Sequence, residues 1–126
     1  MAGFTPMRLN TAAKGTGGIA RFTHWWPLLP RLGAFIGQET RIPYDFHEII
    51  AAIAPRPVLV VAPELDYQST PADIVACLKE DRQVYALLKA EDKLALYVAQ
   101  DYNRFSPEIR EQVLDQLKKM RLLAQP

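Results

Sequence analysis

The sequence predicts an α/β fold in which a small parallel sheet is flanked by helices. Two short runs of consecutive apolar residues, at 58–62 and 94–98, have the composition of strands covered on both faces. Segments with apolar residues at helical spacing precede, separate and follow these runs. A strand–helix–strand unit with so long a crossover is expected to be right-handed, with its strands parallel.

The first helix is expected from Phe46 to Ala54. Asp45 is a residue type that caps helix N-termini, and Pro55 and Pro57 end the helix because proline disfavours helical geometry in the residue before it. Three isoleucines share its apolar face: Ile49, Ile50 and Ile53. The first strand then follows as Val58–Ala62, ended by Pro63.

The middle helix is expected from Thr70 to Lys89. Thr70 is its N-cap, Pro71 takes the first helical position, and Asp73 can complete a capping box. Its apolar stripe is imperfect and consists of Ile74, Cys77, Leu78, Val84 and Leu88.

The second strand is Leu94–Val98, and the last helix opens at Ser106-Pro107 and runs to about Leu122. Its apolar residues lie at helical spacing: Ile109, Val113, Leu114, Leu117 and Met120. Residues 45–122 therefore form a helix–strand–helix–strand–helix unit.

Residues 1–44 are expected to be a loop-rich excursion of the same single domain, 1–126. All 6 glycines lie between Gly3 and Gly37, and no periodic apolar set of their own is present. Two parallel strands do not make a stable sheet alone. Another strand must therefore come from residues 1–44, from a partner, or from a larger protein of which this chain is part.

Composition excludes several classes of protein. The chain has 126 residues, with 15 Lys+Arg against 14 Asp+Glu, which argues against a dedicated nucleic-acid or anionic-membrane surface. Cys77 is the single cysteine, so an intrachain disulfide framework and a multi-cysteine zinc site are excluded. No long apolar run or signal-peptide pattern is visible, so we expect a cytoplasmic protein without cofactor or metal.

Candidate site residues follow the two strands, because ligands bind at the carboxyl ends of strands in open parallel sheets. The two loops are 63–69 and 99–105, and Asp66 is the best-placed carboxylate. Asp66 can orient a histidine or act as a general acid or base. The alternative interpretation is a loop aspartate that caps backbone amides.

The run from Ile53 to Asp66, which opens with Ile-Ala-Pro-Arg-Pro, resembles the C-terminal portion of α/β-hydrolase-fold esterases. It is similar to dienelactone hydrolases and acetyl xylan esterases, and the resemblance covers roughly residues 44–120. It implies a partial α/β-hydrolase-like sheet and hydrolysis of a small ester through an acyl-enzyme. Asp66 matches the position of the triad acid in such enzymes, with Pro63 where glycine often stands.

The chain departs from this family at the other two triad positions. No G-x-S-x-G nucleophile elbow occurs, and the only serines are Ser69, in the acid loop, and Ser106, expected as an N-cap. Asn103 stands where the family's histidine is expected, and asparagine cannot take a proton from serine at neutral pH.

Two histidines remain as candidates for the missing base. His24 either enters the site from the excursion and replaces that base, or packs among its aromatic neighbours. His47, on the first helix, is interpreted as structural. Neither makes a metal site, because no second ligand stands at ligand spacing. The apolar stretch around His24 is a pocket wall, an interface or core: Phe22, Trp25, Trp26, Leu28, Leu29, Leu32, Phe35 and Ile36.

Two functional hypotheses result. The first is a C-terminal fragment or truncated homologue of a serine ester hydrolase that carries the acid position and is inactive alone. The second is a self-associating binding or assembly module derived from the same fold, for which the shortage of strands favours a homodimer.

Overall fold

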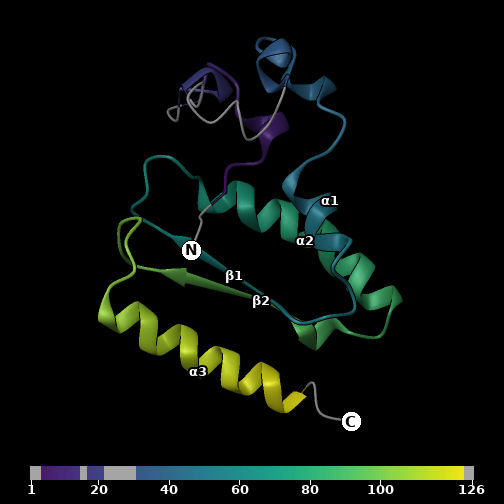
Figure 1. Cartoon of the computed structure of the whole chain (residues 1–126), viewed down its shortest axis with the longest axis vertical. Helices are drawn as coiled ribbons and strands as arrows, with labels where there is room; N and C mark the ends of the chain where they lie inside the picture. Colours follow the sequence, from purple (N-terminus) through teal and green to yellow (C-terminus); the bar gives the residue numbers. More distant parts are fainter. Residues whose placement is uncertain (1–3, 15–16, 22–30, 124–126) are drawn as a thin grey trace.

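The computed structural model describes residues 4–14, 17–21 and 31–123, without the side chains of 121–123. Five longer elements follow one another in the order that the sequence predicts: α1 (Phe46–Ala51), β1 (Val58–Pro63), α2 (Pro71–Leu87), β2 (Leu94–Ala99) and α3 (Pro107–Leu123). Figure 1 shows α2 and α3 on opposite sides of the two strands. The arrangement is thus a small α/β fold in three layers.

The two strands are parallel, as predicted. Val58 pairs with Leu94 at one end of the ladder, and Pro63 pairs with Ala99 at the other. Each strand is one residue longer than its apolar run, because Pro63 and Ala99 continue the pairing. In the described part of the chain the sheet has these two strands only.

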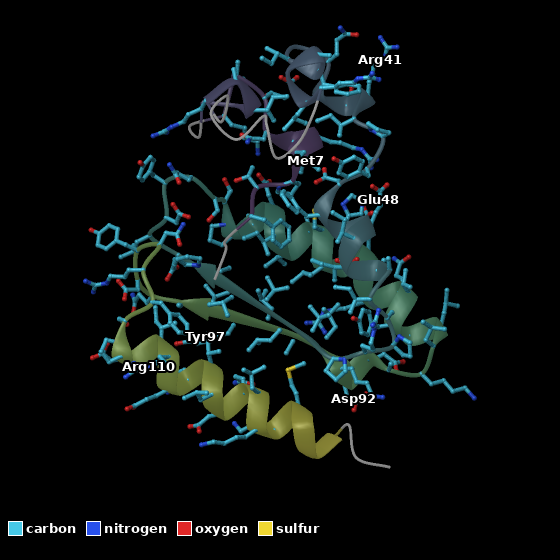
Figure 2. All side chains as sticks on the ribbon, viewed as in Figure 1. Met7, Arg41, Glu48, Asp92, Tyr97 and Arg110 are labelled. Atoms are coloured by element: carbon cyan, nitrogen blue, oxygen red, sulfur yellow. The ribbon has the colours of Figure 1, made fainter. Side chains whose placement is uncertain are left out.

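Side chains alternate along each strand, so each strand contributes apolar side chains to both faces of the sheet, and helices pack on both faces. Tyr97 points from β2 toward α3 (Figure 2) and packs with the buried cluster on that face. The α3 face is formed by Val61, Ala99 and Ile109 with Leu59, Tyr97 and Val113. The opposite face, against α1 and α2, is formed by Ile50, Val60, Ala62, Ile74, Leu78, Tyr85, Ala90 and Leu94.

Helix α1 begins as predicted and ends earlier. The Asp45 carboxylate accepts a hydrogen bond from the Phe46 N–H, and a capping box with Glu48 is complete. The helix ends at Ala51 rather than Ala54 because the following amides bond three residues back, as the Ala54 N–H does to the Ala51 carbonyl. This tighter turn leads into Pro55.

Helix α2 begins at Pro71, as predicted, but without the predicted capping box. The Thr70 side chain makes no capping hydrogen bond, and Asp73 instead pairs with the Lys14 ammonium at 2.8 Å. The helix ends at Leu87, two residues before the predicted end, because Lys89 takes a left-handed conformation with φ 53°.

The described parts of residues 1–44 contain short 3₁₀ helices and no strand, so a third strand from this region is not found there. Their buried residues make a separate small cluster of Met7, Ile19, Leu32 and Ile42, with Phe35 and Phe46 against it. His24 and most of the aromatic stretch, Phe22 to Leu29, lie outside the described residues. No helix found in the described ranges has the length and apolar character of a membrane span.

Candidate functional site

The loops that follow β1 and β2 meet at one edge of the sheet. Because the strands are parallel, both carboxyl ends lie at this edge (Figure 1), as the sequence predicts. Two backbone bonds join the loops: the Glu64 N–H donates to the Ala99 carbonyl at 2.7 Å, and the Leu65 N–H donates to the Asp101 carbonyl at 3.1 Å. We call this edge, residues 63–69 with 99–105, the carboxyl edge.

Asp66 is buried in the carboxyl edge, with 6% of its surface exposed. Its carboxylate accepts a hydrogen bond from the Gln68 N–H at 2.8 Å and one from the Ser69 hydroxyl at 3.3 Å. The first is the local aspartate-to-backbone bond of an Asx turn. Each carboxylate oxygen has two lone pairs, so both oxygens keep the capacity to accept one further donor.

The other predicted positions at this edge differ in exposure. Asn103 lies on an exposed bend of the second loop, and Ser69 is buried beside Asp66. Ser106 caps α3, since its hydroxyl oxygen accepts from the Ile109 N–H at 3.4 Å. Ser69 therefore has a carboxylate as its hydrogen-bond partner, and a carboxylate alone is a weak base for a serine hydroxyl.

His47 belongs to α1, and its side chain faces α2. Its Nδ1 is 3.8 Å from the Cys77 Sγ, and its Nε2 is 3.7 Å from a carboxylate oxygen of Glu80. A cavity of about 260 Å³ is lined by these three residues and by Arg8 and others, but not by Asp66. The imidazole thus belongs to a polar group separate from the described carboxyl edge.

The chemistry of the His47 group is limited. Burial, reinforced by the negative charge of Asp45, raises the pKa of the Cys77 thiol to about 12, so the reactive thiolate is scarce at neutral pH. Within the described ranges, no three His, Cys, Asp or Glu residues are grouped so that they could hold a metal ion.

Asp81 lies on α2 with 1% of its surface exposed. Neither carboxylate oxygen has a hydrogen-bond partner among the residues that the structure describes. Burial raises the pKa of this carboxyl to about 6, against the opposing effect of His47. The helical spacing carries a signal, because Asp81 lies three residues after Leu78 and four before Tyr85, on the face of α2 that is buried.

Comparison with known families decides the relationship of the chain. The family described as "Glucuronyl esterase, fungi" matches residues 2–89, more than half of the sequence. The chain belongs to this family. The esterase relationship predicted from the run Ile53–Asp66 is therefore confirmed, whereas the finer likeness to dienelactone hydrolases and acetyl xylan esterases stays a prediction.

The family match includes α1, β1, α2 and Asp66, and it ends before β2 and Asn103. No match was found with a curated protein or with a solved structure. The glucuronyl esterase relationship thus rests on the part of the chain that carries Asp66.

Proposed function

We propose that this glucuronyl esterase family member supplies the acid position of a serine-esterase triad, Asp66, and has no esterase activity unless another polypeptide segment supplies the nucleophile and base. The observation that carries the proposal is the buried Asp66 carboxylate at the carboxyl edge, on a loop tied to the loop after β2. This is the edge at which open parallel sheets bind their ligands.

The geometry of Asp66 supports the acid role. A triad acid holds the imidazole in one orientation by accepting its N–H, and it stabilises the imidazolium that forms. Asp66 is fixed by Gln68 and Ser69 and keeps an acceptor site on each oxygen. A histidine from another segment would therefore meet a carboxylate that is already oriented.

The sequence supports the absence of autonomous activity. It contains no G-x-S-x-G elbow, which exposes the nucleophile on a sharp strand-to-helix turn. Ser69 is buried, Ser106 caps a helix, and Asn103 replaces a base with a group that takes no proton. The family's name indicates an ester of glucuronic acid as the substrate class of the complete site.

An assay of ester hydrolysis tests this proposal. The purified chain is incubated with methyl glucuronate and with a p-nitrophenyl acyl ester, and we expect rates equal to buffer for wild type, Asp66→Asn and Asp101→Asn. Asp101 is the matched control because it is a carboxylate of the neighbouring loop, bonded to the Tyr102 N–H and Arg104. Hydrolysis by the wild-type chain would overturn the proposal, and its loss in Asp66→Asn but not in Asp101→Asn would show that the activity belongs to this chain and not to a contaminant.

A self-associating module is the second candidate, and one observation favours it. The sheet has two strands in the described part of the chain, so the outer edge of each strand carries backbone groups that could pair with a second copy. Light scattering during size-exclusion chromatography separates the outcomes. Association predicts twice the monomer mass of 14.3 kDa at high concentration, whereas 14.3 kDa at every concentration contradicts it.

A further inference from the structure

Three contacts from the N-terminal region reach the stretch that follows Asp66. We call residues 4–14 and 17–21 the N-terminal strap. The Thr5 hydroxyl donates to the Gln68 carbonyl at 2.6 Å, and the Lys14 ammonium pairs with Asp73 at 2.8 Å. The Arg21 guanidinium lies 4.9 Å from the centre of the Tyr67 ring and donates to its hydroxyl at 3.2 Å. The strap thus contacts Tyr67, Gln68 and Asp73.

The N-terminal strap is itself fixed to α1. The Asp45 carboxylate accepts from the Met7 N–H at 2.8 Å and from the Arg8 N–H at 2.9 Å, in addition to capping the helix. Figure 2 labels Met7 in the strap and Glu48 on α1, and both terminal nitrogens of the Arg8 guanidinium donate to the Glu48 carboxylate. These bonds fix the backbone of the strap close to Thr5, and thereby the position of Thr5.

Gln68 connects the strap to Asp66 directly. Its N–H donates to the Asp66 carboxylate, and its carbonyl accepts from Thr5. Thr5 is a buried residue with 8% of its surface exposed, so water competes little for this bond. On the other side the Glu64 N–H donates to β2, at the Ala99 carbonyl, and the Leu65 N–H donates to the Asp101 carbonyl in the loop after β2.

From this geometry we propose that the N-terminal strap fixes the orientation of the Asp66 carboxylate, and that Thr5 is a positioning residue acting through Gln68. The catalytic meaning of this orientation rests on the proposed function. The positioning itself is a property of the chain and is measurable without esterase activity.

Hydrogen exchange of the Gln68 amide in the full chain, followed by NMR, is the test. Thr5→Val removes the hydroxyl and keeps the shape, and we expect the exchange rate of this amide to rise about fivefold to tenfold. Thr5→Ser should restore slow exchange. Thr40→Val is the matched control, since Thr40 is an exposed threonine of the same region.

Two further readouts distinguish positioning from general loss of stability. Amides of β1 and β2, such as those of Val61 and Leu96, should exchange at the wild-type rate in Thr5→Val. The carboxyl carbon resonance of Asp66 should shift in Thr5→Val and return in Thr5→Ser, because the donors around that carboxylate change. Unchanged Gln68 exchange and an unchanged Asp66 resonance in folded Thr5→Val would overturn the inference.

Lys14→Met keeps the inference testable if Thr5→Val does not fold. It removes a half-exposed ion pair with Asp73, so we expect a smaller rise at Gln68, about twofold. No rise at Gln68 in Lys14→Met would then contradict the inference. Failure of the proposed function appears separately, as ester hydrolysis by the wild-type chain.

Discussion

The chain holds buried carboxylates in two kinds of place, and their surroundings differ. Asp45 and Asp66 lie at a helix start and in a loop, where backbone N–H groups are available, and both carboxylates accept them. Asp81 lies in the middle of α2, where each N–H is used within the helix, and its oxygens have no partner among the described residues. Backbone N–H donors offset the cost of burying a carboxylate, and among the described residues Asp81 has no such donor.

Asp45→Ala tests the satisfied side of the comparison and should have the largest effect. The change removes the acceptor of the Met7, Arg8 and Phe46 N–H groups and also breaks the capping box with Glu48. We expect the free energy of unfolding to fall by about 3 kcal/mol in urea titrations. The control Asp115→Ala, on the exposed surface of α3, should change it by less than about 0.5 kcal/mol. Equal effects of the two substitutions would contradict the comparison.

Asp81→Asn tests the carboxylate that has no hydrogen-bond partner among the described residues, through the pH dependence of stability. The pKa of Asp81 is about 6 in the folded chain, above its ordinary value of 3.8, so the folded state binds the proton more tightly. Between pH 4 and pH 7.5 the wild type therefore loses stability as this group ionises, by about 2 kcal/mol. Asparagine does not ionise and lacks this loss.

The measurement is the difference in unfolding free energy between Asp81→Asn and wild type at pH 4.5 and at pH 7.5. It should move in favour of the variant by about 2 kcal/mol as the pH rises. The contributions of other titrating groups to this difference cancel, because the substitution leaves those groups unchanged. The same difference at both pH values would show that Asp81 is not held in a strained charged state.

Ser69→Ala sharpens the comparison at the carboxyl edge. It removes one of the two donors to the Asp66 carboxylate and leaves the Gln68 N–H in place. We expect a loss of about 1 kcal/mol in thermal or urea unfolding, smaller than for Asp45→Ala. A loss as large as that of Asp45→Ala would mean that the backbone donor does not suffice.

Thr70→Ala should have the smallest effect. Its side chain makes no capping hydrogen bond, although the sequence predicts one, so we expect a change below about 0.5 kcal/mol. A loss above about 1 kcal/mol in the same titration would indicate that the threonine caps α2 in solution.

The parts of the fold that depend on neighbouring residues were predictable from the sequence. Asp45 caps α1, Pro71 starts α2, and the apolar runs pair in parallel. The placement of Asp66 at the carboxyl edge follows from that order of elements. Here short-range signals and the sheet topology agree.

The rest depends on contacts between distant residues. The prediction of a capping box at α2 was wrong because the Asp73 carboxylate instead accepts a hydrogen bond from the ammonium of Lys14, 59 residues away. The link from Thr5 to Gln68 has no local signal, since the bond is specified only by the docked strap. Asp81 was missed because the stripe expected on α2 continued through Val84 and Leu88, whereas the buried face continues through Asp81 and Tyr85 and leaves Leu88 exposed.

If Asp66 occupies the acid position of a triad whose nucleophile and base come from another segment, no serine of this chain is an activated nucleophile. Intact-mass spectrometry after incubation with a fluorophosphonate, which labels activated serines, tests it most directly. We predict that the chain keeps its unmodified mass, because Ser69 is buried beside a carboxylate without a base. A stoichiometric adduct on Ser69 that disappears in Asp66→Asn would contradict the claim.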